Sequence, residues 1–352
     1  MNNLILKSRG LDLGTHMLIV SNADEAGHIS YKEEVDAFFV IDANDQSREM
    51  IEMLNISYVE KNGKLYVIGK PAVSFANMFK QETRRPMQTG CLNKKDIEAL
   101  GMLNALLSNL LGPGDGSPLV YSVTSQPLGS EMSFDYHKAQ VESLLRGMGY
   151  EPKPIQEARA IALSELAESR FTGLAISCGS GTTTVWLGLL GMDNPNFQFS
   201  VDRGGDWIDT NAADNFAGLT RTKVQTVKEK GILIRANEDL KTDHLEGPEL
   251  VEARAKQALS IYYREYIKAV IKGIKYKLDK EQLPEFDGPI PIVIAGGTSS
   301  PEDFIDVFKE EWEKAKTGLA ISDIKKAKDH FRAVSKGCLI AAQIEAKKAA
   351  KK

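Results

Sequence analysis

The chain has 352 residues, with 44 Lys and Arg against 48 Asp and Glu, so its net charge is −4 and implies no general nucleic-acid-binding surface. Its 42% hydrophobic and 26% charged residues are typical of a soluble globular protein, and its length favours about two domains. Three cysteines without metal-ligand spacing favour a reducing cytoplasm. The opening MNNLILKSRG is too short and polar for a signal peptide, and no apolar run is long enough to span a bilayer.

The first predicted element is a pair of apolar strands around a Gly-Thr turn, GLDLGTHMLIV at residues 10–20. Glycine lets the backbone approach a ligand closely, and successive N–H groups can form a concave anion nest. Phosphate is the ligand that we expect such a turn to bind. The candidate phosphate contacts are Gly14, Thr15, His16 and Met17, the last two through backbone only.

The next 140 or so residues alternate strand and helix signals. An inserted unit over about residues 30–81 has its clearest signal at Asn62–Gly63, which lies between two β-type runs and predicts a type I′ hairpin. Helical spacing follows at 96–109 and 136–148, with a strand at 119–123 between them. We expect PIQEARAIALS, residues 154–164, to begin a helix that leads into a second domain.

A second glycine hairpin repeats the design of the first. The sequence GLAISCGSGTTTVWLGLL from residue 173 has an apolar run, a Gly/Ser/Thr turn and another apolar run. One such turn alone could be an ordinary hairpin. Two such hairpins far apart in the chain suggest duplicated halves that bind one polyphosphate from both sides. The candidate phosphate contacts here are Gly179, Ser180, Gly181 and Thr182.

The remainder is predicted to be mostly helical, apart from a third glycine site. Residues 211–283 have helical character, and PIVIAGGTSS at 291–300 is a buried-type strand that runs into a Gly-Gly turn, followed by a helix-like segment from Pro301. A closing helix is expected at 329–350. Its lysines most simply form a solvated tail, with a weak lipid or acidic-partner contact as the minor alternative.

The ordered set LDLGT, SCGSGTTT, RGGDWID and IAGGTSS resembles the actin-like ATPases, and is most similar to bacterial actins of the MreB and MamK type, over roughly residues 11–342. The resemblance implies an α/β fold of two related domains around a nucleotide cleft, each with an inserted subdomain. Domain I would be 1–153 with an insertion at about 30–81, and domain II 154–352 with an insertion at about 207–283. It also implies ATP or ADP and Mg²⁺ as cofactors.

The resemblance assigns catalytic roles to two carboxylates. Asp12 would organise the Mg²⁺ shell, through water, with a turn-capping role as the alternative. Glu157 would position the attacking water, although Gln156 could do so instead, or Glu157 could be an exposed first-turn residue favoured by the helix dipole. Ser177 stands where the family normally has aspartate. A neutral hydroxyl is a poor substitute for a carboxylate acting on Mg²⁺ or water, so we expect slow ATP hydrolysis.

The nucleoside is expected at three further places. The adenine would lie over Gly296, Gly297 and Thr298. The nucleotide would be bordered by the backbone of Gly204, Gly205 and Asp206. Lys228 and Glu229 resemble the helix that reaches the ribose and the adenine edge. Their alternative is a charged, solvated helix face.

The function implied is a cytoplasmic ATP-binding protein that polymerises head-to-tail into cytoskeletal or cytomotive filaments, because a heterologous contact that does not close yields a filament. Its partner would be itself, with cargo or adaptor proteins that the sequence leaves open and no direct nucleic-acid contact. A non-polymerising actin-fold scaffold and a chaperone-like ATPase are the alternatives. Against the chaperone alternative, we expect the chain to be too short for the substrate domain of DnaK-type chaperones. Ser177 leaves the scaffold alternative standing, because a scaffold needs nucleotide binding and not turnover.

Overall fold

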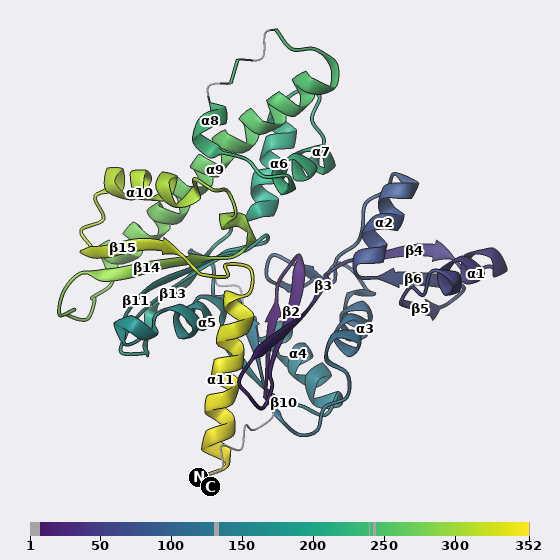
Figure 1. The fold of residues 1–352 in the computed structure, drawn as a ribbon, viewed down its shortest axis with the longest axis horizontal. Coiled ribbons are helices and arrows are strands. Elements are labelled where there is room, and N and C mark those ends of the chain that lie inside the picture. The colour runs from purple at the N-terminus through teal and green to yellow at the C-terminus, as the bar shows by residue number, and fades with distance from the viewer. Residues whose placement is uncertain (1–7, 130–133, 239, 242–243, 352) are drawn as a thin grey trace. The chain divides into compact units, whose positions relative to one another are not determined.

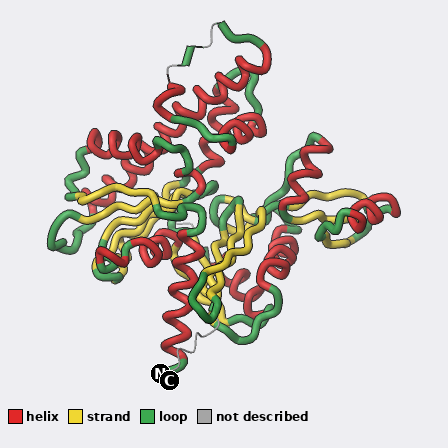
Figure 2. Tube along the Cα trace, viewed as in Figure 1, coloured by secondary structure: helices red, strands yellow, loops and turns green. Residues whose placement is uncertain are grey.

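The computed structural model describes residues 8–129, 134–238, 240–241 and 244–351. Contacts divide the chain into a first unit, residues 1–123, 133–156 and 335–352, and a second unit, residues 124–132 and 157–334. Each unit combines one five-stranded sheet with helices, so both are α/β units (Figure 2). No helix in the described ranges is long and apolar enough to cross a membrane.

The sheet of the first unit has the order β10-β9-β1-β2-β3. Its strands are β1 (Arg9–Leu13), β2 (Met17–Ala23), β3 (Ile29–Val35), β9 (Pro118–Val123) and β10 (Glu151–Gln156). The first three form an antiparallel meander, and β9 and β10 run parallel to β1. Parallel strands need long crossovers, which here contain α3 (Ala99–Leu111) and α4 (Asp135–Gly147). Leucines of α3 and of β1 form the core between them.

A smaller sheet of order β4-β6-β5 belongs to the same unit. It comprises β4 (Phe38–Asp42), β5 (Tyr58–Lys61) and β6 (Lys64–Ile68), with α1 (Asp45–Met53) and α2 (Lys70–Phe79). The predicted hairpin at Asn62–Gly63 is confirmed: both residues have positive φ, 51° and 71°, between the paired strands β5 and β6. Residues 29–35 pair with β2 in the larger sheet, so the small sheet begins at Phe38. A two-stranded ribbon follows, β7 (Met87–Gln88) and β8 (Cys91–Leu92).

The sheet of the second unit repeats the first, in the order β13-β12-β11-β14-β15. Its strands are β11 (Gly173–Cys178), β12 (Thr183–Leu189), β13 (Met192–Val201), β14 (Ile290–Ala295) and β15 (Ile321–Lys326). Again three successive strands form an antiparallel meander, and two later strands add in parallel beside the first. The strand pattern expected for duplicated halves is therefore present in both units.

The described helices of the second unit pack against this sheet or against one another. They are α5 (Glu157–Glu165), α6 (Gly205–Asn215), α7 (Arg221–Glu229), α8 (Ile234–Glu238), α9 (Gly247–Lys280) and α10 (Phe304–Ala315), with the 3₁₀ turns η1 (Ala167–Ser169) and η2 (Gly297–Ser299). The 34-residue α9 packs against α6, α7, α8 and α10. Its tyrosines join aromatic side chains of α10 in the core.

The last helix, α11 (Ala333–Ala349), packs from Ser335 onward on the first unit (Figure 1). The Ser21 hydroxyl donates to the Ser335 carbonyl at 2.7 Å. A Cβ at Gly10 would lie 2.3 Å from the Leu339 nitrogen. Only glycine in β1 allows this close an approach of helix to strand.

Four predicted helix starts were too early. The helix expected over 96–109 begins at Ala99 and ends at Leu111. Residues 154–156 belong to β10 and α5 begins at Glu157, because Pro152 and Pro154, which lack an N–H, are tolerated on this edge strand. The closing helix begins at Ala333 and not at 329, since Asp329 accepts the Arg332 N–H in a separate turn. The helix expected from Pro301 begins at Phe304.

Candidate functional site

The turn between β1 and β2 is closed by one short backbone bond. The Gly14 N–H donates to the Met17 carbonyl at 3.1 Å, and a Cβ at Gly14 would lie 2.5 Å from that oxygen. The Thr15 hydroxyl accepts the Gly90 N–H at 3.0 Å, and the His16 carbonyl accepts the Asp36 N–H at 2.9 Å. These bonds use a side chain and a carbonyl to hold the turn in place. The Thr15 hydroxyl acts as acceptor here and keeps its O–H, so the turn can offer a ligand its backbone and that hydroxyl.

Asp12 precedes this turn and is held by Ser122 of β9. The Ser122 hydroxyl accepts the Leu13 N–H at 2.9 Å and donates to Asp12 Oδ1 at 2.8 Å. Burial raises the pKa of Asp12 to about 6, against the lowering effect of the Ser122 bond. In such a setting, a nearby cation stabilises the ionised form of the carboxyl group. Sequence reasoning missed Ser122, although it lies in the predicted strand 119–123.

The turn between β11 and β12 is closed in the same way. The Gly179 N–H donates to the Thr182 carbonyl at 3.1 Å, and Thr182 and Thr124 share a hydroxyl contact at 3.2 Å. The two glycine hairpins, one in each unit, thus have equivalent closures at Gly14 and Gly179. Gly181 lies within this second turn.

Two other sequence segments of the second unit converge on the Gly179–Ser180 turn. The Gly179 carbonyl accepts both the Gly205 N–H at 3.1 Å and the Thr298 hydroxyl at 2.7 Å. The Ser180 carbonyl accepts the Asp206 N–H at 2.8 Å. A Cβ at Gly204 would lie 2.3 Å from the Ser180 oxygen, so the start of α6 can approach the turn only with glycine there.

Lys228 of α7 joins this cluster and is not part of a solvated face. Its Nζ lies 2.5 Å from Asp209 Oδ2 and 3.4 Å from the Gly205 carbonyl. Burial raises the pKa of Asp209, an effect that Lys228 opposes. The other oxygen of Asp209, Oδ1, is buried without a hydrogen-bond partner. Glu229, in contrast, is exposed and accepts from Gln225 at 2.8 Å.

The Gly296–Gly297 turn follows β14 and packs on β11. Gly296 has φ +98°, and a Cβ there would lie 2.3 Å from the Cys178 carbonyl. Its N–H donates to the His330 carbonyl at 2.7 Å. The neighbouring Phe331 ring would lie 3.5 Å from a Cβ at Gly297, yet 53% of Phe331 is exposed. Sequence reasoning missed this aromatic side chain because it assigned residue 331 to the closing helix.

Ser177 and Glu157 lie together in the second unit. Ser177 pairs directly with Thr184 across β11 and β12, so their side chains share one face of the sheet. The Thr184 hydroxyl lies 3.5 Å from Glu157 Oε2. Glu157 is 8% exposed and Ser177 3% exposed, which contradicts the alternative of an exposed first-turn glutamate. Gln156 is also buried, at the end of β10.

The candidate residues therefore form two described groups. The group in the first unit comprises Asp12, Gly14, Thr15, His16 and Met17. The second unit brings together Gly179, Ser180, Gly204, Gly205, Asp206, Lys228 and Thr298 by the contacts above, with Gly296 and Gly297 beside them. In the described ranges no group of three His, Cys, Asp or Glu side chains could hold a metal. A hydrated Mg²⁺, bound through few protein carboxylates and phosphate, does not need one.

Comparisons with known proteins support these assignments of fold. A sequence family described as volactin matches residues 8–342. The MamK double helical filament is similar at a TM-score of 0.69 and 17% identity, over 96% of this chain and 98% of that one. A non-polymerising point mutant of MamK bound to AMPPNP is similar at a TM-score of 0.57 and 18% identity, over 96% of this chain and 99% of that one.

MreB5 of Spiroplasma citri bound to ADP gives a TM-score of 0.66 and 15% identity, over 99% of each chain. A search of curated proteins returns no match. At these identities the solved structures show the fold alone, whereas the family match covers nearly the whole described chain. The chain therefore belongs to the volactin family and has the actin-like α/β fold of the MreB and MamK type.

Proposed function

We propose that this chain binds ATP and ADP with Mg²⁺ and polymerises head-to-tail into filaments. The observation that carries the nucleotide proposal is the Gly179 carbonyl, which accepts from both Gly205 and Thr298. Three glycine-containing segments far apart in sequence meet at this point. A Cβ at Gly179, Gly204 or Gly296 would strike backbone, so these glycines let the three segments pack closely. Successive backbone N–H groups in such turns can form a nest for phosphate.

Each group of residues has a proposed task in nucleotide binding. The turns at Gly14–Met17 and Gly179–Thr182 donate backbone N–H groups to phosphate oxygens. Asp12, oriented by Ser122, holds water molecules of the Mg²⁺ shell. Gly296 and Gly297 accommodate the base, and Lys228 borders the nucleoside. The nucleotides in the solved MamK and MreB5 structures support this assignment by likeness of fold.

Hydrolysis is proposed to be slow. Glu157 is a carboxylate beside Thr184 and close to the second turn, where it can orient a water and accept its proton. Ser177 supplies only a hydroxyl on the same sheet face, so Asp12 and Glu157 are the two carboxylates proposed to act on metal and water. Loss of one such contribution typically costs about two to three orders of magnitude in rate.

Polymerisation is proposed from the likeness to the MamK filament and to MreB5. A head-to-tail contact uses two different surfaces of each subunit and therefore continues indefinitely unless it closes into a ring. A nucleotide-binding scaffold that does not polymerise is the second candidate. Ser177 favours it, because a scaffold needs binding and not turnover.

The test combines binding and assembly in one preparation. Thermal unfolding is followed with Mg²⁺ and ATP, AMPPNP, ADP or no nucleotide, and polymer is assayed by sedimentation and negative-stain microscopy. We expect nucleotide to raise the melting temperature and polymer to depend on nucleotide state. A melting curve unchanged at millimolar nucleotide would refute the binding proposal. Stabilisation with monomers in every state would establish the scaffold instead.

A further inference from the structure

The register of the first sheet places three polar side chains on the sheet face that carries the buried Val20. Arg9 lies opposite Asn22, and Lys32 lies opposite Val20. Directly opposed residues of antiparallel strands project from the same face, and Val20 is buried on the face covered by α3. Arg9, Asn22 and Lys32 therefore share that face, at the end of β1 remote from the Gly14 turn.

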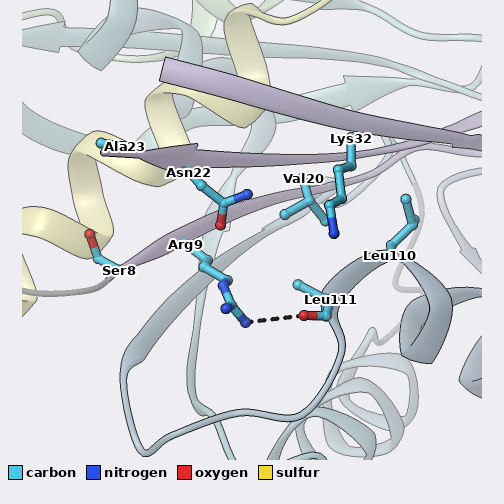
Figure 3. Close-up of a pocket in the computed structure, with 8 residues that line it drawn as sticks. All are labelled: Ser8, Arg9, Val20, Asn22, Ala23, Lys32, Leu110 and Leu111. Carbon is cyan, nitrogen blue, oxygen red and sulfur yellow. Dashed lines mark hydrogen bonds between the residues drawn. The ribbon is translucent and has the colours of Figure 1, made fainter. Parts of the chain in front are cut away.

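These side chains line a cavity of about 280 Å³ at the C-terminal end of α3 (Figure 3). We refer to it as the Arg9–Lys32 cavity. Its apolar wall is formed by Val20, Leu110 and Leu111, and its polar groups include Arg9, Asn22 and Lys32. In Figure 3 the Lys32 amine, the Asn22 amide and the Arg9 guanidinium extend into the same space from three strand positions.

Arg9 is held in place without being neutralised. Its Nη1 donates to the Leu111 carbonyl at 3.2 Å, and its guanidinium lies 4.9 Å from the centre of the Tyr150 ring. A guanidinium has five N–H donors, so others remain for a ligand. Among the residues that the structure describes, no carboxylate forms an ion pair with Arg9 or Lys32, and no acidic side chain lines the cavity.

We infer that the Arg9–Lys32 cavity binds a small phosphate oxyanion, as free phosphate or as a phosphate monoester whose organic part contacts the apolar wall. Two like charges at one partly enclosed site repel each other, and an oxyanion removes this repulsion. The planar guanidinium matches phosphate geometry, the ammonium adds a point charge, and the amide adds a neutral donor. This site is independent of the proposed nucleotide site.

The test is calorimetric titration of the full chain with inorganic phosphate and, separately, with glycerol 3-phosphate. Lys32 is exposed, so Lys32→Gln spares the fold, and we expect at least about tenfold weaker binding of both ligands, as for loss of a charged hydrogen bond. Arg9→Gln should weaken binding as well, but it also removes the bond to Leu111. Lys272→Gln, the same charge change at an exposed position of α9, should bind like wild type.

The titrations are repeated with saturating AMPPNP and Mg²⁺, because the proposed nucleotide turns also accept phosphate. Persistence of the Lys32-dependent binding supports the cavity, whatever the fate of the nucleotide proposal. Tighter binding of glycerol 3-phosphate identifies a monoester, and equal binding identifies free phosphate. Absence of binding, equal binding by wild type and Lys32→Gln, or complete loss with AMPPNP overturns the inference.

Discussion

The hydroxyl of Thr298 donates to the carbonyl of Gly179 at 2.7 Å, across 119 residues of sequence. This bond ties the turn after β14 to the turn between β11 and β12. The Thr298 side chain is buried and the bond is partly buried, so its loss leaves the half-buried Gly179 carbonyl with one partner fewer. The bond is therefore a direct probe of whether the glycine segments act together.

Thr298→Val removes the hydroxyl at nearly constant volume. We expect about 1 kcal/mol lower stability in urea, as for one buried hydrogen bond, and weaker ATP binding because the two turns lose their fixed spacing. Thr226→Val is the control, since that hydroxyl bonds only its own exposed helix turn. Equal ATP affinity of Thr298→Val and wild type would contradict the coupling of the two turns.

Gly204→Ala tests the close approach of α6 to the Ser180 turn. The added Cβ would lie 2.3 Å from the Ser180 oxygen, which is backbone and cannot rotate away. We expect a loss of about 1–3 kcal/mol in urea unfolding, as for other overpacked sites, together with loss of ATP binding.

The matched control is Gly101→Ala in α3, where nothing lies within 4 Å of the new Cβ. That variant should instead gain up to about 1 kcal/mol, because alanine is the better helix former. If both variants gained stability, Gly204 would not be required by packing.

The sequence predicted the fold well where the pattern was local. The Asn62–Gly63 hairpin and the two glycine turns follow from residues that permit few alternatives. The convergence of Gly179, Gly205 and Thr298 was expected only through the resemblance, because a bond across 119 residues has no local signature. Ser122 and Phe331 were missed for a related reason: a serine in a strand or an aromatic before a helix gains meaning only from its neighbours in space.

The Asp12 carboxyl should make the stability of the ligand-free protein depend on pH. Its folded pKa of about 6 lies above the ordinary aspartate value of 3.8, so folding favours the protonated form. The Asp12 carboxyl therefore lowers the free energy of unfolding once it is ionised. This destabilisation is absent below about pH 4, grows between about pH 4 and 6, and is complete above about pH 6.

Asp12→Asn removes that destabilisation. We expect the variant to be more stable than wild type at about pH 7.5 and not at about pH 4, measured by urea unfolding without nucleotide. Mg²⁺-dependent ATP binding should be lost in the variant, and in wild type it should weaken as pH falls through about 6. A variant less stable than wild type at the higher pH would show that the ionised carboxylate is not penalised.

Phe331 is expected to stack on the base. It is 53% exposed and its ring lies against Gly297, where we propose that the purine binds. Stacking on an aromatic side chain is worth about 1–3 kcal/mol per base, so Phe331→Ala should weaken ATP binding by about 5- to 150-fold. Tripolyphosphate, which has no base, should bind both proteins equally. Equal losses for both ligands would mean that Phe331 supports the turn and does not contact the base.

The rate of hydrolysis tests the placement of Ser177 and Glu157. Ser177→Asp puts a carboxylate on the sheet face that carries Thr184, near Glu157. Because two carboxylates then share a buried setting, we expect the ligand-free variant to be less stable than wild type and its pKa values to rise. With Mg²⁺ and ATP the added negative charge has a cation to balance it, so phosphate release should accelerate.

Glu157→Gln keeps the shape of the side chain but cannot accept a proton, so it should lose most of the remaining activity while ATP binding is retained. Phosphate release at saturating ATP is measured for wild type and both variants, and filament mass is followed in the same samples. Slow wild-type hydrolysis should leave ATP-state polymer long-lived, and Ser177→Asp should shorten its lifetime. If wild type hydrolyses ATP rapidly and Ser177→Asp slows it, then the hydroxyl of Ser177 is itself part of the working geometry, and a carboxylate other than Glu157 holds the water.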